Sequence, residues 1–501
     1  MGSSIVRNII GAILLIVLSF IVGIMAADSA KEAALIIIAA AGIIGIIAMG
    51  KHVWITLFIL PPFFSILPSI GGLHGSFLLY PIVLCYWVLL RMLGYVKFTW
   101  RKLIGADLFV IVLTLLIGIA FYRKPASIDV INNFFNIDTD FIAARAYPIF
   151  FFSLIRYLCL SCIPFQKKLF IKILKWNLII TLVIYFISGI FSLFVTISSD
   201  DAETSRYSMF RSFSEVLFIA VYCGAPFAKL MVSPKAIFAI FIALASAVFS
   251  GFRSILAQFG LLFIIVSVVK KECYIIVLSL TVGVITLGIL SSSDALKTLP
   301  FAAQRALSAI PGLSVASHIK NETNASTDWR VRMWKWALDP RTGHIKNYLL
   351  GDGFGIEKAY HTRSLRAIMK GELNYGNNSH FAKTRLWHSL LIDTLQSLGY
   401  LGLFVIYGCT LYATFVMYKV NTALRNTPFF VYSMIFTCNI AIFTVYIFLS
   451  TSPLHTYMNT LLSALVYLKI FHNIAVDEGK LVPMGKKVKY VPLLIKQQQC
   501  A

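Results

Sequence analysis

The sequence predicts an all-α polytopic membrane protein with about 14 transmembrane helices (12 to 14) and one large extracytoplasmic loop domain. Two observations support this fold class. Of the 501 residues, 59% are hydrophobic and only 13% are charged, a balance that excludes a soluble globular protein. In addition, apolar runs of roughly the 20 residues needed to cross a hydrocarbon core of about 30 Å recur along almost the whole chain.

The expected spans form a transmembrane bundle within 1–291 and a set of C-terminal helices within 386–475. The run near 5–26 resembles a signal peptide, but it is long and the chain continues to span after it, so we expect a helix. The spans lie near residues 5–26, 33–49, 53–68, 75–94, 104–122, 146–163, 171–197, 213–232, 236–250, 254–269, 273–291, 386–418, 428–450 and 454–475.

The net charge of +23 gives the orientation of the chain. When the segments between spans are assigned to alternate sides, most Lys and Arg fall on the side that holds both termini. Positive charge is retained in the cytoplasm, so we expect both termini there. The basic tail at 476–501 is an orientation and lipid-headgroup signal, and nucleic acid is not expected as a partner.

The segment 292–385 is polar and rich in Lys and Arg, which indicates an extracytoplasmic domain with an anionic ligand. Within it, "DWRVRMWKWALDP" reads as a helix with Asp328 as N-cap and Pro340 as stop. Its apolar stripe either lies on the membrane surface or packs against the rest of the loop; the stripe consists of Trp329, Met333 and Trp336. On the neighbouring face, Arg330 lies beside Trp334, where a cation–π contact could orient the guanidinium.

The glycine cluster "LLGDGFGIE", which contains Gly353, predicts a tight turn that could offer backbone N–H groups to an anion. No metal site is expected, because the histidines of this domain lack ligand spacing and no acidic cluster accompanies them.

Ionisable residues within or beside apolar runs indicate a wet, charged pocket that faces outward. Arg253 stands in the short turn "FSGFRS", where it either serves a functional cavity or forms a salt bridge to Glu215. The other members of the expected pocket are Arg156, Arg206, Arg211 and Asp393.

His388, in "RLWHSLLIDTLQSLGYLGL", is the candidate for proton transfer, because imidazole is the side chain that titrates near neutrality. Asp393 lies five residues on, about 140° around a helix, so it cannot orient His388 directly and is expected to pack or to line a cavity.

These segments together resemble the O-antigen ligase and polymerase family of bacterial envelope enzymes. "RYSMFRSFSEVLFIAVYCGAP" is similar to the family's Arg-rich outer loop and following helix, and "FSGFRSILAQF" carries an essential arginine onto Arg253. "RVRMWKWALDPRTGHIKNYLLGDGFG" maps a second arginine to Arg330, and "HSLLIDTLQSLGYLGL" maps the catalytic histidine to His388. Ser389 and Ser397 depart from the family's usual Asn and acidic residue.

The resemblance implies a GT-C-like glycosyltransferase in a bacterial inner membrane, with its active site on the periplasmic side. The donor would be an undecaprenyl-diphosphate-linked glycan, and the acceptor would be lipid A-core or a growing glycan. Membrane lipids would be further partners. His388 would be the general base, and Arg253 and Arg330 would hold the diphosphate without a metal or other cofactor. The implied substrate-binding residues are Arg206, Arg211, Arg332, Trp334, Gly353 and Glu215.

Three activities within this family stay open: a ligase, a polymerase and a protein O-oligosaccharyltransferase. From another class, a lipid-linked glycan transporter would show charged pairs near mid-membrane and broken helices in both halves.

Overall fold

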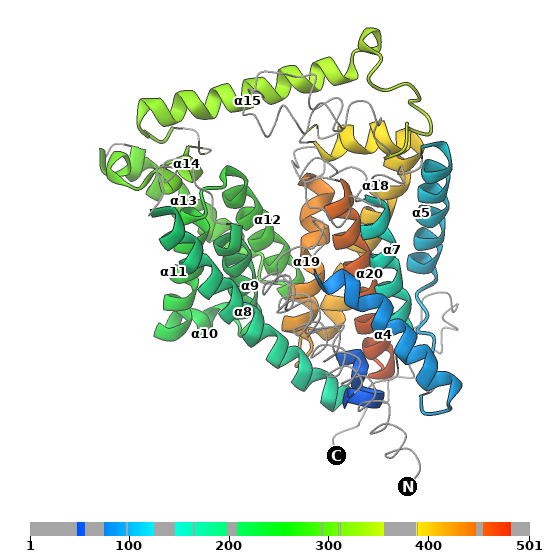
Figure 1. Cartoon of the computed structure of the whole chain (residues 1–501). Helices are drawn as coiled ribbons and strands as arrows, with labels where there is room; N and C mark the ends of the chain where they lie inside the picture. The colour runs from blue at the N-terminus through cyan, green and yellow to red at the C-terminus, as the bar shows by residue number, and fades with distance from the viewer. Residues whose placement is uncertain are drawn as a thin grey trace, which may run out of the picture.

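The structure is a computed structural model, and in the part that it describes all regular secondary structure is helical (Figure 1). It describes residues 48–55, 75–96, 99–124, 146–163, 166–197, 208–291, 294–308, 310, 312–354, 387, 389–446 and 454–481. The 3₁₀-helices are η1 (Gly50–Ile55), η4 (Asp294–Thr298) and η5 (Pro340–Thr342). The α-helices are α4 (Gly75–Met92), α5 (Ile104–Arg123), α7 (Ala146–Cys162), α8 (Lys167–Ile197), α9 (Ser208–Gly224), α10 (Phe227–Val232), α11 (Pro234–Phe249), α12 (Arg253–Lys270), α13 (Tyr274–Ser291), α14 (Phe301–Leu307), α15 (Ser317–Leu338), α18 (Leu390–Leu424), α19 (Phe430–Tyr446) and α20 (Leu454–Asp477).

Five helices in the described part are long and apolar enough to cross a membrane: α5, α8, α12, α18 and α20. Shorter apolar helices accompany them, among them α7, α11 and α19. The chain is therefore an α-helical protein with the composition of a polytopic membrane protein. The expected spans from residue 75 onward fall on helices, whereas those near 5–26, 33–49 and 53–68 lie wholly or mostly outside the described residues.

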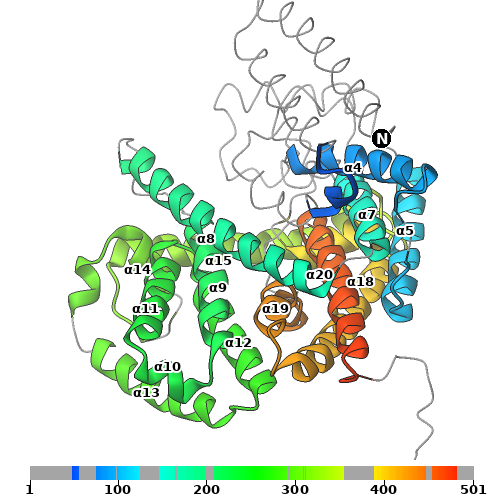
Figure 2. The same ribbon diagram turned by 90° about the horizontal axis from the view of Figure 1, so that it is seen from below.

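The helices pack as two groups. One contains α4, α5, α7, α18 and α20; the other contains α8 to α14, with α19 in contact with α18 and α20 on one side and with α9 and α12 on the other. Small side chains permit close approach, as on α11, which packs against α9 and buries Ala243, Ser246 and Ala247. Seen from below, α15 runs behind both groups (Figure 2).

The connections between the described helices lie at two opposite ends of the bundle (Figure 1). At one end, Arg101 donates to the Leu160 carbonyl at 3.0 Å and Arg425 donates to the Lys270 carbonyl at 2.9 Å. At the other end lie α14, α15 and the first turn of α18 (Figure 1). The described part of the expected loop domain, 294–308 and 312–354, therefore lies at the end of the bundle opposite Arg101 and Arg425.

Three expected element boundaries are wrong, each for a physical reason. The span near 213–232 is divided into α9 and α10, because Pro226 has no N–H to continue the helix. The span near 386–418 is broken at Gly399, whose φ of 68° and ψ of −168° are non-helical. The helix expected to start at Asp328 begins at Ser317, so Asp328 lies in its interior; it does end before Pro340, at Leu338.

Candidate functional site

One face of α15 connects the N-terminal end of α12 with the segment just before α18. Thr323, Thr327, Arg330 and Trp334 follow one another at spacings of four, three and four residues, so they share a face of this helix. Arg253, the first residue of α12, donates from Nη1 to the Thr323 carbonyl at 3.0 Å and to Thr327 Oγ1 at 3.1 Å. We call this row of four residues on α15 the α15 stripe. At its first end it contacts Arg253, one of the predicted catalytic arginines.

The other end of the stripe reaches the residue before His388. Trp334 Nε1 donates to the backbone carbonyl of Trp387 at 2.9 Å. Arg330 stands one turn before Trp334, so the structure brings Arg253, Arg330 and the approach to His388 onto one face of α15. His388 itself, like Arg206, lies outside the described residues.

Asp393 holds the chain on one side of position 388. It is buried, and its Oδ1 accepts from the backbone N–H of Trp387 at 3.0 Å. The Trp387 indole donates to Gln396 Oε1 at 2.9 Å, and Gln396 Nε2 donates to the His344 carbonyl at 3.0 Å. The aspartate therefore acts on the backbone beside His388, a role that the helical-wheel argument about side chains could not find.

Ser389 holds the chain on the other side of position 388 as the N-cap of α18. Its side chain accepts from the Ile392 N–H at 3.4 Å. Ser is a strong N-cap residue, so Ser389 fixes the start of α18.

The glycine loop docks into the break of α18. Two hydrogen bonds run from the glycine loop to α18: the N–H groups of residues 352 and 353 donate to the carbonyls of Gln396 and Ser397 at 2.6 and 3.0 Å. Two more run from α18 to the loop: the N–H groups of residues 400 and 401 donate to the carbonyls of Tyr348 and Leu349 at 2.7 and 3.1 Å. Arg123 of α5 also donates to the Gly351 carbonyl.

The close approach of the two backbones explains the glycines. Gly351 and Gly399 both have positive φ, and a Cβ at either would overlap the opposite backbone. The N–H of Gly353 is already bonded to Ser397 and a Cβ there would lie 2.6 Å from the Ala120 carbonyl. We therefore correct the expectation for Gly353: this N–H serves docking and is not available to an anion.

Arg211 and Glu215 form a pair on α9. Arg211 Nε lies 3.4 Å from Glu215 Oε1, and Arg211 Nη2 donates to Gln258 Oε1 on α12 at 2.7 Å. Glu215 therefore pairs with Arg211, while the described contacts of Arg253 go to α15. Arg332 is exposed on α15 and, two residues from Arg330, points about 200° away from the stripe.

Aromatic side chains surround the start of α18. Met333, Ala337, Trp387 and Ile392 are buried together, and Trp329, Trp334 and Trp336 pack against them. Of the two alternatives for the Trp329, Met333 and Trp336 stripe, packing within the protein is the one found.

The place of His344 was not predicted from the sequence: its ring centroid lies 4.0 Å from that of Trp336 and 5.6 Å from that of Trp387. Its Nε2 is buried with no hydrogen-bond partner among the described residues. Burial lowers the pKa of His344 below its ordinary value, because the charged form of the imidazole loses hydration.

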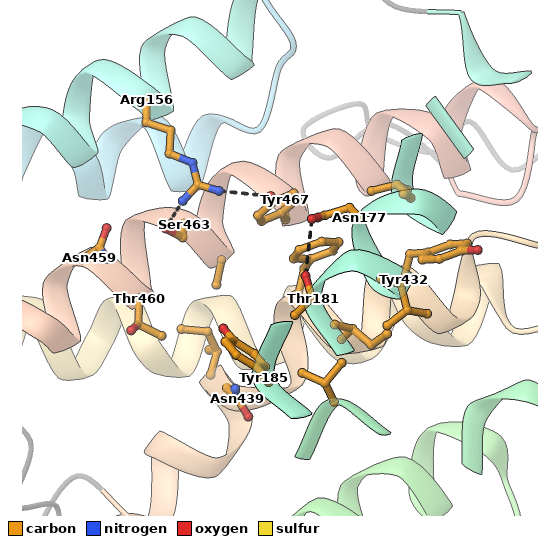
Figure 3. A pocket seen from close by; sticks show the side chains of 17 residues that line it. Arg156, Asn177, Thr181, Tyr185, Tyr432, Asn439, Asn459, Thr460, Ser463 and Tyr467 are labelled. Carbon is orange, nitrogen blue, oxygen red and sulfur yellow. Dashed lines mark hydrogen bonds between the residues drawn. The ribbon is translucent and has the colours of Figure 1, made fainter. Parts of the chain in front are cut away.

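A separate polar cavity of about 290 Å³ lies between α7, α8, α19 and α20 (Figure 3). Arg156 projects into it and donates to Ser463 Oγ at 2.8 Å and to Tyr467 Oη at 3.0 Å. Of the residues expected to form one outward pocket, Arg156 lines this cavity, whereas Arg211, Glu215 and Asp393 do not, and Arg206 lies outside the described residues. No family model, no curated protein and no solved structure matches this chain.

Proposed function

We propose that the protein is a membrane glycosyltransferase of the O-antigen ligase type. It moves a glycan from undecaprenyl diphosphate onto an acceptor hydroxyl at the periplasmic surface of a bacterial inner membrane. The observation that carries this proposal is the stripe on α15, which connects Arg253 through Arg330 to the fixed backbone at Trp387, next to His388.

In this proposal the two arginines bind the diphosphate. A guanidinium pairs bidentately with phosphate oxygens and stays charged at any working pH, so it also stabilises the leaving group as negative charge develops on it. The loss of the diphosphate then needs no divalent metal. Arg211, held beside α12 by Gln258, would add positive charge near Arg253, and Arg332 would face substrate only from the exposed side of α15.

His388 acts as the general base. Its imidazole takes the proton of the acceptor hydroxyl while the oxygen attacks the anomeric carbon from the face opposite the diphosphate, which inverts the configuration. Asp393 and Ser389 support this step by fixing the backbone on both sides of the histidine. The aromatic side chains around Trp387 limit the access of water to the start of α18.

The direct test is transfer by purified protein in lipid nanodiscs, with lipid-linked glycan as donor. His388→Ala should lower the transfer rate by about 10² to 10⁴, the usual contribution of a general base. His318→Ala, in an exposed part of α15, removes a histidine from the same domain and should transfer at the normal rate. Normal transfer by His388→Ala would refute the assignment.

Within the same chemistry, a ligase, a polymerase and a protein O-oligosaccharyltransferase differ only in the acceptor. A deletion strain separates the first two. Bare core with accumulated lipid-linked polymer identifies a ligase, whereas a single repeat unit capped on core identifies a polymerase.

A lipid-linked glycan transporter is the second candidate, and the cavity at Arg156 favours it, because a cation within an apolar bundle is typical of a transport path. In that case His388→Ala would leave translocation of lipid-linked glycan across sealed vesicles unchanged, and no glycan would be transferred by the wild-type protein.

A further inference from the structure

We propose that the cavity between α7, α8, α19 and α20 binds one neutral sugar unit, either free or attached to a lipid (Figure 3). This site is separate from the α15 stripe, and the inference does not rest on the proposed transfer reaction. It rests on polar groups of the cavity wall that do not join helices to one another, on the chemical character of these groups and on their depth in the bundle.

Two asparagines of the wall are not used in helix packing. In a membrane bundle, the side chain of an Asn commonly forms a hydrogen bond to a neighbouring helix. The Asn177 amide of α8 instead accepts from Thr181 of the same helix at 3.5 Å, and the Asn439 amide of α19 is approached by Sγ of its neighbour Cys438 at 4.0 Å. Among the described residues, therefore, neither amide is bonded to a second helix, although both line the cavity.

Two tyrosines add hydroxyl groups to the same wall. Tyr185 of α8 and Tyr432 of α19 are half-buried and line the cavity. Glu215 acts on Tyr185 through its charge, but within the described part of the chain neither tyrosine hydroxyl forms a hydrogen bond. A hydroxyl and an amide can each donate and accept a hydrogen bond. These groups therefore offer a ligand donors and acceptors together.

The charge of the wall is compatible with a neutral ligand. No carboxylate is among the described residues that line the cavity, so a cation would find no partner of opposite charge there. The one cation of this wall, Arg156, is held by Ser463 and Tyr467 and lies over the Tyr467 ring, 5.6 Å from its centroid. A hydroxyl group both donates and accepts, as the free groups of the wall do. The wall therefore suits a neutral molecule that carries several hydroxyl groups.

The apolar part of the wall and the size of the cavity point to a sugar ring. The rings of Tyr185, Tyr432 and Phe436 combine apolar faces with two polar tips, which matches a molecule that has both C–H surface and hydroxyl groups. The cavity volume is about 290 Å³, close to the lower end of the range of about 300–1,000 Å³ for ligand pockets. The space therefore suits one sugar unit and not a chain of them.

The depth of these polar groups favours a binding role over an incidental one. Asn439 lies in the middle of α19, and Asn177 lies ten residues, or roughly 15 Å, from the start of α8. Polar side chains at membrane depth are costly and are typical of substrate paths and binding sites. The cavity brings such groups from four helices to one place (Figure 3).

The experiment is saturation transfer difference NMR on the full-length protein in lipid nanodiscs, without sugar-based detergent. The probes are the methyl glycosides of glucose, galactose, N-acetylglucosamine and rhamnose, each titrated separately, and at least one should bind. The octyl glycoside of the sugar that binds is then added as competitor, below its critical micelle concentration. A gain in affinity from the octyl chain identifies a sugar attached to a lipid, and no gain identifies a free sugar.

Three variants locate the binding. Tyr185→Phe removes a hydroxyl that has no hydrogen bond within the described chain, so the fold should be kept while the affinity falls roughly three- to tenfold, the effect of one hydrogen bond. Asn439→Leu has a similar size but removes both a donor and an acceptor, so it should lower the affinity by about tenfold or more. Tyr418→Phe makes the matched change at an exposed position on α18 and should bind like the wild type.

Two results would overturn the proposal. One is that none of the four methyl glycosides binds the wild type, which would leave the cavity to water. The other is that the bound glycoside has the same affinity for Tyr185→Phe and Asn439→Leu as for Tyr418→Phe, which would place the binding elsewhere on the protein.

Discussion

The carboxylate of Asp393 accepts a hydrogen bond from the backbone N–H of Trp387 at 3.0 Å, so an acidic residue in an apolar run holds the chain beside position 388. Asp393 also lies in the first turn of α18, where the helix dipole favours negative charge. This contact accounts for the aspartate without assigning it any chemistry.

Replacing Asp393 by Ala should destabilise the protein by about 1–3 kcal/mol, because a buried N–H loses its acceptor. Asp393→Asn keeps an oxygen at the same place and should lose less. The measurement is the free energy of unfolding in detergent. Asp328→Ala, on the exposed side of α15, serves as control and should change stability by no more than about 0.5 kcal/mol. An Asp393→Ala protein as stable as this control would contradict the role.

Gly399→Ala should weaken the docking of the glycine loop on α18. The backbone at Gly399 has a φ of 68° and a ψ of −168°, a region nearly restricted to glycine, and a Cβ would overlap the Leu349 carbonyl. We expect a loss of about 1–3 kcal/mol from the backbone alone. Gly118→Ala is the matched control: that position in α5 is open, so the substitution should be neutral or stabilise by up to about 1 kcal/mol. Limited proteolysis within 346–354 reports the undocking.

Two variants separate the proposed phosphate role of Arg253 from its contact with α15. Thr327→Val removes the 3.1 Å hydrogen bond between Arg253 and the Thr327 hydroxyl but keeps the guanidinium. Arg253→Lys keeps a positive charge but removes the planar guanidinium that can bind phosphate bidentately. If Arg253 binds the diphosphate, Arg253→Lys should lower transfer by about 100-fold or more, as expected for a lost bidentate phosphate contact, and Thr327→Val by much less. Equal losses in the two variants would indicate a tether only.

The contribution of His344 to stability should decrease as the pH falls below about 6.5. Burial lowers the pKa of His344 from its ordinary value of 6.5, so below that pH the unfolded chain binds a proton that the folded chain does not. The contribution is therefore complete above the ordinary pKa and is lost on acidification. His344→Phe keeps an aromatic ring between Trp336 and Trp387 and should flatten the pH dependence of the unfolding midpoint between about pH 7.5 and 5.5.

The titration of Asp339 does not interfere with this measurement. The Arg341 guanidinium lowers its pKa below the ordinary value of 3.8, so its contribution is present above that value and is lost only at more acidic pH. A His344→Phe protein with the same slope as the wild type would show that other groups cause the dependence.

Local sequence predicted much of the helical framework. The span near 104–122 corresponds to α5 (Ile104–Arg123) and that near 254–269 to α12 (Arg253–Lys270), because length and apolar composition determine a membrane helix. The break at Gly399 was not predicted, because its cause is the backbone of Leu349, about fifty residues earlier in the sequence.

The candidate site was predicted less completely. Arg253 and Arg330 were singled out from sequence, but their shared face on α15 depends on a helix that starts at Ser317, in a polar stretch with little periodic signal. The roles of Asp393 and His344 depend on contacts with Trp387 across a turn and between segments. Residue spacing within one helix cannot predict such contacts.

The two attachments of α15 also limit how the bundle can move. Thr323 and Trp334 are roughly 16 Å apart along the axis of a continuous helix, and they are bonded to Arg253 of α12 and to Trp387. An α-helix resists stretching, so Arg253 and Trp387 keep a constant separation while both bonds last. If the two helix groups move apart to admit a bulky lipid-borne substrate, they must rotate about α15, and the gap between them must open at the end of the bundle opposite α15. Otherwise one of the two attachments of α15 must first be released.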